Sequence, residues 1–190
     1  CNVDGTRILI NQMKKSSVTK IIFSSSATVY GDKFEPPWSE SLNVITPNNA
    51  YARSKRIIEK MLHALTNERK DFKVGILRYF NPIGSHSSGL LGDKIDNSTN
   101  LVPAIISTIL GNQDFIEVFG TDYHTKDGTG VRDYIHITDL ASAHLKAISR
   151  LLSKKSKSLY EFFNVGNGTG YSVLDVITSF EKVNNLKLNY

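Results

Sequence analysis

The sequence contains little cysteine and no long hydrophobic run. Its single cysteine, Cys1, excludes an internal disulfide and provides no cysteine cluster for a metal, so we expect a reducing, cytoplasmic location. No stretch approaches the roughly 18 apolar residues of a membrane span, and we expect no membrane partner. With 40% hydrophobic and 22% charged residues among 190, the composition indicates a globular protein that can bury one core.

Histidine spacing and charge distribution argue against a metal site and a nucleic-acid partner. The 5 histidines show no His-Glu-x-x-His pattern or comparable ligand spacing. The net charge of +5 is scattered, and its densest cluster is Lys154, Lys155 and Lys157. This cluster follows a predicted helix, where cations complement the helix dipole. We therefore expect neither metal nor nucleic acid, and favour a small anionic ligand.

Helix and strand patterns alternate along the first half of the chain. Helices are predicted over residues 3–16 and 49–67, and strands over 21–24 and 74–79. The second strand is a continuous apolar run, typical of a parallel sheet covered on both faces. The apolar stripe predicted for the second helix consists of Ile57, Ile58, Met61, Leu62 and Leu65. This alternation predicts an α/β fold, with part of a doubly wound parallel sheet of the Rossmann type.

The second half has longer polar segments between its predicted elements. Loops are expected over residues 32–49, 84–100 and 120–130. Further helices are expected over 101–110, from a cap at Thr138 or Asp139 through 152, and after a capping box at 172–175. Further strands are expected over 116–119, 134–137 and 162–165.

Tyr51 and Lys55 form a candidate catalytic pair because they are four residues apart and share one face of the predicted helix. A nearby ammonium favours the phenolate and lowers the pKa of a tyrosine, which would make Tyr51 a general base. With 8 tyrosines in the chain, chance alone supplies about 0.7 such pairs, so a lysine stem lying over a half-buried ring is an alternative. The position favours catalysis, since residues 24–26 and 80–81 follow strands at the carboxyl edge of the sheet.

Other candidate residues each have a structural alternative. Arg132 follows a glycine-rich loop and can clamp a phosphate, or form an ion pair with Asp133 or Asp139. Phe119 can stack on a base or fill the core. The glycines of residues 166–170 have the pattern Gly-x-Gly-x-Gly, which favours a tight strand-to-helix turn over a dinucleotide cradle.

Six motifs occur in a fixed order: SSSATVYGD, Tyr51-x-x-x-Lys55, LRYFNPIG, Asn100-Leu101, VFGTDY and DGTGVRDYIH. Together they resemble the UDP-galactose 4-epimerases of the extended short-chain dehydrogenase/reductase superfamily, over essentially all 190 residues. The resemblance implies an isomerase of galactose metabolism that interconverts UDP-galactose and UDP-glucose with tightly held NAD. It oxidises C4, rotates the 4-keto sugar and returns the hydride to the other face.

The resemblance also implies roles for individual residues. Tyr51 would be the base, Lys55 would bind the nicotinamide ribose and lower the pKa of Tyr51, and Ser26 would hold the substrate hydroxyl. The other implied cofactor contacts are Asn2, Ser24, Tyr79 and Phe80. The other implied substrate contacts are Ala27, Thr28, Tyr79, Phe80, Asn81, Asn100, Leu101, Val102, Glu117, Val118, Phe119 and Arg132.

The same resemblance implies the domain organisation and a homodimer formed through helices 3–16 and 49–67. Residues 1–83 would be the later half of the NAD-binding Rossmann domain. Residues 84–190 would be a mixed substrate-binding region, with part of a smaller α/β domain and segments that return to the Rossmann domain. The family's glycine-rich GxxGxxG turn is absent from the 190 residues, so we expect an internal fragment that is inactive alone. The alternatives are an epimerase for UDP-N-acetylhexosamines or UDP-pentoses, and a non-catalytic dimerising module.

Overall fold

The structure is a computed structural model that describes residues 2–31, 35–42, 44, 47, 49–93, 100–153, 156 and 158–190. Cys1, the lysine cluster of residues 154, 155 and 157, and part of the predicted loop 84–100 therefore lie outside the described residues. The chain divides into two compact units. Unit 1 comprises Cys1–Phe80 and Asp139–Val165, and unit 2 comprises Asn81–Thr138 and Gly166–Tyr190.

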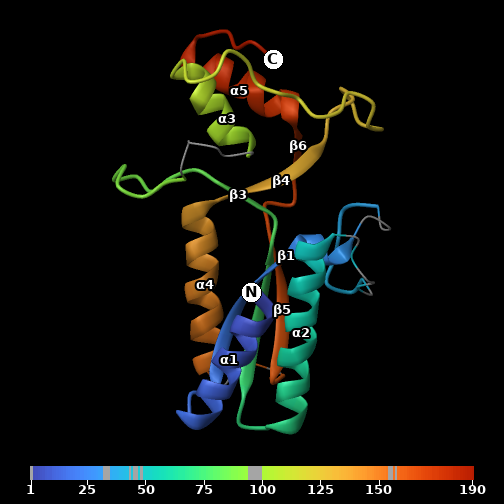
Figure 1. The fold of residues 1–190 in the computed structure, drawn as a ribbon, viewed down its shortest axis with the longest axis vertical. Helices are drawn as coiled ribbons and strands as arrows, with labels where there is room; N and C mark the ends of the chain where they lie inside the picture. The colour runs from blue at the N-terminus through green and yellow to red at the C-terminus, as the bar shows by residue number, and fades with distance from the viewer. Residues whose placement is uncertain are drawn as a thin grey trace. The chain divides into compact units, whose positions relative to one another are not determined.

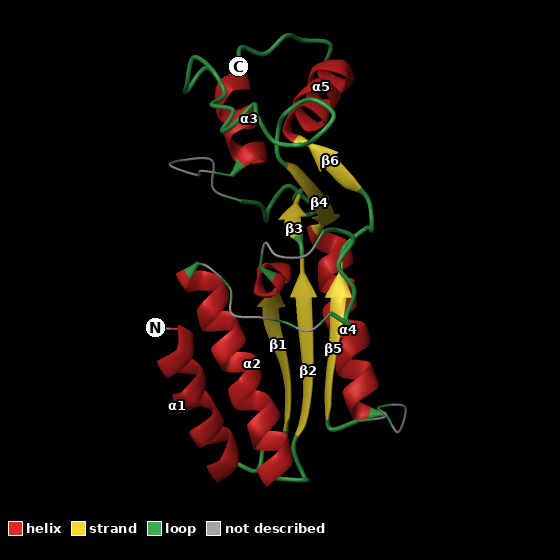
Figure 2. Ribbon diagram, turned by 90° about the vertical axis from the view of Figure 1, so that its right-hand side faces the viewer, coloured by secondary structure: helices red, strands yellow, loops and turns green. Residues whose placement is uncertain are grey.

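Unit 1 is built on a parallel sheet of three strands in the order β1-β2-β5 (Figure 2). The strands are β1 (Lys20–Ser26), β2 (Lys73–Tyr79) and β5 (Tyr160–Val165). Ser26 pairs with Tyr79, and Tyr79 with Val165, so the carboxyl ends of all three strands meet at one edge. The predicted α/β fold with a parallel sheet is confirmed.

Helices cover both faces of this sheet (Figure 1). On one face, α1 (Asn2–Lys15) and α2 (Ala50–Glu68) pack over a core that includes Val74 and Ile76, both fully buried. On the other face lies α4 (Ile137–Leu152). A Cβ placed at Gly75 would lie 2.6 Å from Ile22 Cδ1 and 3.7 Å from Leu151 Cδ1. The glycine therefore allows Ile22 and α4 to approach the centre of the sheet closely.

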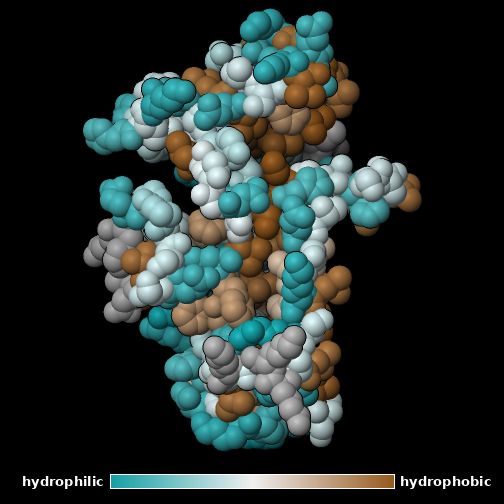
Figure 3. All heavy atoms as spheres, turned by 180° about the vertical axis from the view of Figure 1, so that it is seen from behind, coloured by the Kyte–Doolittle hydropathy of each residue, from teal (hydrophilic) through white to brown (hydrophobic). Residues whose placement is uncertain are grey.

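The helix that carries the candidate pair begins as predicted. The Asn49 side chain accepts a hydrogen bond from the Ala52 backbone N–H at 2.8 Å and caps α2. The predicted apolar stripe is right for Ile58, Leu62 and Leu65, which are buried, but Ile57 is 47% exposed. Exposed apolar side chains (brown) are visible at the surface in Figure 3.

Unit 2 contains three short strands and two helices. These are β3 (Asn81–Ile83), β4 (Val131–His136), β6 (Gly170–Ser172), α3 (Leu101–Ile109) and α5 (Val173–Asn184). β3 pairs with β4 in parallel, and β6 pairs with β4 antiparallel. A second core, formed by Ile105, Ile116, Ile177 and Leu188, joins α3, α5 and the segments that follow them.

Two predicted features of the second half are wrong. Residues 116–119 do not form a strand. Ile116 is buried in the second core and donates one backbone hydrogen bond to the Asn189 carbonyl, so burial rather than strand pairing explains this apolar run. Neither Thr138 nor Asp139 caps α4, because the helix already begins at Ile137. Instead, Nδ1 of His136 accepts from the Thr138 backbone N–H at 3.2 Å.

Two turns were predicted with different success. The capping box of α5 is confirmed, since the Ser172 side chain accepts from the Asp175 N–H and the Asp175 side chain accepts from the Ser172 N–H. The glycine-rich segment after β5 is a turn, as expected, with Gly168 at φ 74°. However, it leads into strand β6 and not directly into a helix.

Candidate active site

The carboxyl end of β1 turns directly into a short 3₁₀ helix, η1 (Ala27–Tyr30), which the sequence did not predict. Ser26 caps this helix, because its Oγ accepts from the Thr28 backbone N–H at 3.3 Å and from Thr28 Oγ1 at 2.9 Å. Val29 and Tyr30 are fully buried and anchor the turn. The Ser26 hydroxyl is therefore held rigidly at the edge where the strands end.

Tyr51 lies in the first turn of α2, and Ser26 and Lys55 are its neighbours. Both acceptor positions of Ser26 Oγ face Thr28, so its single hydrogen remains for another partner. The Ser26 side chain lies close enough to the Tyr51 phenol to lower the pKa of Tyr51. Lys55 Nζ lies 5.5 Å from the Tyr51 ring centroid and donates to the Ser24 carbonyl at 2.8 Å. The structure thus brings together the three residues predicted to be catalytic. Tyr51 is 48% exposed and accessible to a ligand.

Burial dominates the electrostatics of the pair. Burial raises the pKa of Tyr51, the neighbouring Tyr79 raises it further, and the hydrogen bond from Ser26 lowers it. Burial lowers the pKa of Lys55. In the chain without a ligand, desolvation of the phenolate outweighs any attraction from the ammonium. The expectation that Lys55 lowers the pKa of Tyr51 together with the positive charge of bound NAD stays a prediction.

The three consecutive serines have three different partners. Ser24 Oγ lies 2.9 Å from Nε2 of His144, on α4. Ser25 is fully buried and donates to Glu59, on α2, at 2.7 Å. Of the three serines, only Ser26 lowers the pKa of Tyr51. Because successive side chains of a strand point to opposite faces, Ser24 and Ser25 attach the end of β1 to the helices on either side.

A buried ionic network that the sequence analysis missed supports this edge. Glu59 and Arg78 are 0% and 2% exposed, and the guanidinium donates to both carboxylate oxygens, at 2.9 and 2.7 Å. Arg78 also donates to the Tyr30 hydroxyl at 3.1 Å, and Tyr30 donates to Asn164 at 2.8 Å. The sequence signal that could have revealed the network is a charged residue at a core-facing position: Glu59 in the predicted helix 49–67 and Arg78 in the predicted strand 74–79. The network joins α2, β2, β5 and η1.

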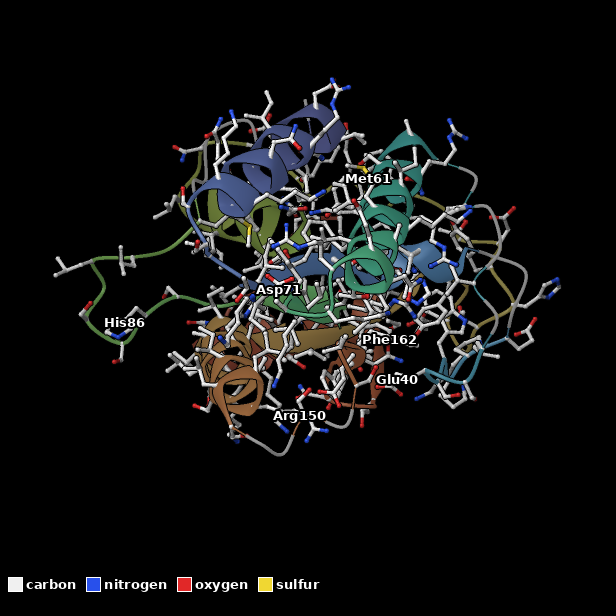
Figure 4. All side chains as sticks on the ribbon, turned by 90° about the horizontal axis from the view of Figure 1, so that it is seen from below. Glu40, Met61, Asp71, His86, Arg150 and Phe162 are labelled. Carbon is white, nitrogen blue, oxygen red and sulfur yellow. The ribbon has the colours of Figure 1, made fainter. Side chains whose placement is uncertain are left out.

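Aromatic side chains continue the edge beyond the network. The Trp38 ring lies 6.2 Å from Phe80 and 5.6 Å from Tyr30. Its carbonyl accepts from the Asn164 side chain at 3.0 Å, and the Asn164 backbone N–H donates to Glu40 at 2.7 Å. Figure 4 labels Glu40, together with Phe162 of β5. Phe80 thus rests on an ordered aromatic layer.

Unit 2 contains the residues predicted to contact the nucleotide. Asn81 is in β3 and Arg132 in β4, and both are exposed. Arg132 donates to the neighbouring Val131 carbonyl, whereas the Asp133 carboxylate accepts from the backbone N–H groups of Asn167 and Gly168. Among the described residues no ion pair between Arg132 and Asp133 or Asp139 is present, so that alternative is not supported.

The remaining predicted contacts lie along α3 and the loop that follows it. Asn100 immediately precedes α3, and Leu101 and Val118 pack against the second core. Phe119 is 74% exposed, which excludes the core-filling alternative. The other predicted contacts in this region are Val102, partly buried in α3, and Glu117, exposed in the loop. Asn2, the predicted cofactor contact at the other end of the chain, is exposed at the start of α1.

The Lys55 side chain, which reaches from α2 to the end of β1, fits the nicotinamide ribose of the predicted NAD. An ammonium has three donors, and one of those of Lys55 is used by the Ser24 carbonyl. The remaining donors suit ribose hydroxyls. A glycine-rich turn for the pyrophosphate is not among the 190 residues, so the fit concerns this end of the cofactor.

The described residues offer neither a cluster of metal ligands nor a helix that could span a membrane. Within the ranges described above, no group of three or more histidine, cysteine or acidic side chains could hold a metal ion. A cavity of about 410 Å³ beside α2 is lined by Arg56, Glu59, Lys60, Tyr160 and Phe162, among others, and includes the buried ion pair. In the same part of the chain, no helix is long and apolar enough to cross a membrane.

Comparison with known proteins agrees with the resemblance in the motifs. The chain is 47% identical over 190 residues to UDP-glucose 4-epimerase of Pasteurella multocida, covering 100% of this chain and 55% of that protein. It superimposes on UDP-glucose 4-epimerase from Bifidobacterium longum in complex with NAD+ and UDP with a TM-score of 0.91 and 42% identity, covering 100% of this chain and 56% of that one.

A second solved structure is similarly close. UDP-glucose 4-epimerase from Stenotrophomonas maltophila, with bound NAD and formylated UDP-arabinopyranose, gives a TM-score of 0.92 at 38% identity, covering 99% of this chain and 55% of that one. The chain thus spans about half the length of the relatives it matches. Residues 1–166 match the model of the NAD dependent epimerase/dehydratase family, and the chain belongs to that family.

Proposed function

We propose that the protein to which this chain contributes interconverts UDP-galactose and UDP-glucose with NAD as cofactor. The observation that carries the proposal is the position of Tyr51, next to Ser26 and with Lys55 Nζ 5.5 Å from its ring centroid, at the carboxyl edge of a parallel sheet. The Pasteurella multocida relative is a UDP-glucose 4-epimerase, and the Bifidobacterium longum structure contains NAD+ and UDP. Unit 1 is proposed as part of the NAD-binding domain, and unit 2 as the substrate-binding part.

The proposed roles follow from the contacts of each side chain. Tyr51 exchanges a proton between its phenol oxygen and the sugar 4-hydroxyl, and Ser26 orients that hydroxyl by donating the single hydrogen that its bonds from Thr28 leave over. Lys55 binds the nicotinamide ribose with the donors that Ser24 does not use. NAD, when bound, supplies a hydride acceptor and donor for C4 of the sugar. A cation close to Tyr51 favours the phenolate and therefore opposes the upward shift that burial imposes on its pKa.

In unit 2 we assign the diphosphate to Arg132 and the uracil to Phe119. Arg132 is exposed, and the adjacent Asp133 carboxylate is already bound by two backbone N–H groups. A guanidinium can therefore approach a phosphate without first breaking an ion pair with Asp133. Phe119 exposes 74% of its surface, which leaves a ring face for a base to stack on.

We also propose a cytoplasmic homodimer that associates through α1 and α2. Ile8, Leu9 and Ile57 expose 59%, 50% and 47% of their surfaces on these two helices. Replacing Ile8 and Ile57 by glutamate is expected to shift the protein from dimer to monomer in sedimentation velocity, because charges disfavour an apolar interface. The same change at Val183, 82% exposed on α5, is the matched control.

The test of the function is a coupled assay of UDP-galactose and UDP-glucose interconversion on the complete reading frame that contains this chain. Tyr51→Phe is expected to lower turnover by about 10²- to 10⁴-fold, the range for a lost acid–base group. Tyr190→Phe removes a hydroxyl from another exposed tyrosine and should leave turnover unchanged. No interconversion by the unaltered protein would refute the proposal.

A UDP-pentose is the second candidate substrate, because the Stenotrophomonas maltophila structure contains a formylated UDP-arabinopyranose. The same assay with UDP-pentoses, and with UDP-N-acetylhexosamines, distinguishes the candidates. The ratio of kcat/KM values decides which substrate the site prefers.

A further inference from the structure

His144 makes two hydrogen bonds that together define which nitrogen carries the proton. Its Nδ1 lies 2.8 Å from the Leu140 carbonyl oxygen, one turn earlier in α4. A carbonyl can only accept, so Nδ1 must carry a hydrogen. In the neutral ring Nε2 is then an acceptor, and the Ser24 hydroxyl, 2.9 Å away, is the donor.

Ser24 is consequently fixed at two of its atoms. Its hydroxyl is bonded to His144 on one face of the sheet, and its carbonyl accepts from Lys55 Nζ at 2.8 Å. The two contacts attach the end of β1 to α4 through the Ser24 side chain and to α2 through the Ser24 backbone.

His144 also lies near Tyr79, a neighbour of Tyr51. Its ring centroid is 6.4 Å from that of Tyr79, and Tyr79 contributes to the raised pKa of Tyr51. The imidazole thus reaches the candidate pair by two routes, through Ser24 to Lys55 and through Tyr79 to Tyr51. All of these residues belong to unit 1.

We propose that His144 is a positioning residue, which accepts a hydrogen bond from Ser24 and thereby holds the Ser24 carbonyl where it binds Lys55. His144 contacts neither Tyr51 nor Lys55 through a hydrogen bond in the described structure. This assignment also gives the Ser24 hydroxyl a structural role in place of the predicted cofactor contact. The catalytic consequence rests on the proposed epimerase function, whereas the hydrogen-bonded chain does not.

The two bonds of His144 can be separated by substitution. The amide of glutamine reaches the Nε2 position and offers an oxygen to Ser24, whereas the shorter asparagine reaches only the Nδ1 position and offers an N–H to Leu140. His144→Gln should therefore preserve the Ser24 contact, and His144→Asn should lose it. Leu151→Ala, at a buried position of the same helix, loosens α4 without removing either bond and is the matched control.

The first measurement is ¹⁵N NMR of the histidine ring nitrogens in the complete protein. We expect the neutral His144 ring to be protonated at Nδ1, and a proton at Nε2 would overturn the proposal. This arm uses the unaltered protein and needs neither substrate nor cofactor.

The second measurement is the acetylation rate of Lys55, determined by competitive labelling and mass spectrometry. Loss of the Ser24 carbonyl destabilises the charged amine and exposes it, so both effects increase the rate. In His144→Asn, Lys55 should be acetylated at least about threefold faster than in the unaltered protein. This ratio is equivalent to a change of about half a pH unit in the conditions of the reaction. His144→Gln and Leu151→Ala should each stay within about twofold. Equal rates for His144→Asn and His144→Gln, or a threefold rise with Leu151→Ala, would overturn the proposal even if the epimerase function is correct.

Discussion

The sharpest prediction concerns Glu59→Gln, which removes one charge from the buried network while keeping the shape of the side chain. Glu59 is fully buried, and its carboxylate accepts four hydrogen bonds, from Ser25, Arg56 and twice from Arg78. An amide has only one oxygen, so at least one of these donors would meet an N–H group. The Arg78 guanidinium, which is 2% exposed, would lose its counter-charge.

The size of the effect follows from this burial. Removing one partner of a buried ion pair costs about 3–5 kcal/mol, because the other charge remains in a medium of low dielectric constant. A typical domain is stable by about 5–15 kcal/mol, so the change removes a large part of the folding free energy. Arg56→Gln is the matched control, because Arg56 also bonds to Glu59 but its side chain is 25% exposed. We expect it to cost less than about 1 kcal/mol.

Urea unfolding followed by tryptophan fluorescence is the assay. Trp38 is the only tryptophan among the 190 residues and lies in unit 1, where its ring is 5.6 Å from that of Tyr30. Its emission therefore reports the unfolding of the unit that contains the network. The double substitution Glu59→Leu with Arg78→Met removes both charges and is expected to recover most of the loss. A cost for Glu59→Gln within about 1 kcal/mol of the Arg56→Gln cost would refute the reasoning.

Three further predictions concern a cap, a loop and a titration. Asn49→Ala should lower the free energy of unfolding by about 1 kcal/mol and also lower turnover, because it removes the side chain that caps the turn carrying Tyr51. Asn49→Asp keeps a capping oxygen and should leave the free energy of unfolding unchanged in urea unfolding and the turnover unchanged in the coupled assay. Asp127→Asn should lower the thermal unfolding midpoint above pH 5, because the carboxylate accepts from Thr129 and Ser172, and hydrogen bonds lower its pKa. This stabilisation is present above the ordinary aspartate pKa and is lost as the pH falls, so the difference between the two proteins should shrink in acid. Tyr51 should ionise above the ordinary tyrosine pKa of 10.0 in difference absorbance against Tyr51→Phe. The protonated Tyr51 therefore makes its full contribution to the stability of the folded state below pH 10, and this contribution is lost as the pH rises through the raised pKa. Ionisation of Tyr51 below pH 10 without ligand would contradict the structure.

Local patterns in the sequence predicted those elements whose stability comes from their own residues. The Asn49 cap, the capping box at Ser172 and the apolar run of β2 depend on neighbours within a few positions, so they are readable in one dimension. The strand predicted over residues 116–119 was wrong because an apolar run is equally consistent with a strand and with burial under helices. η1, β3 and β6 are short and lack a periodic pattern of their own.

The sequence by itself determined the α/β class, the helix that carries Tyr51 and Lys55, and, through six ordered motifs, the family. Only the tertiary structure decided how the three serines are divided among His144, Glu59 and Tyr51, since their partners lie 120, 34 and 25 positions away along the chain. It also decided the direction of the pKa shift of Tyr51 in the chain without a ligand, which the spacing of Tyr51 and Lys55 does not determine. A pKa depends on burial and on every nearby charge, and these are set by the packing of α2 against the end of β1.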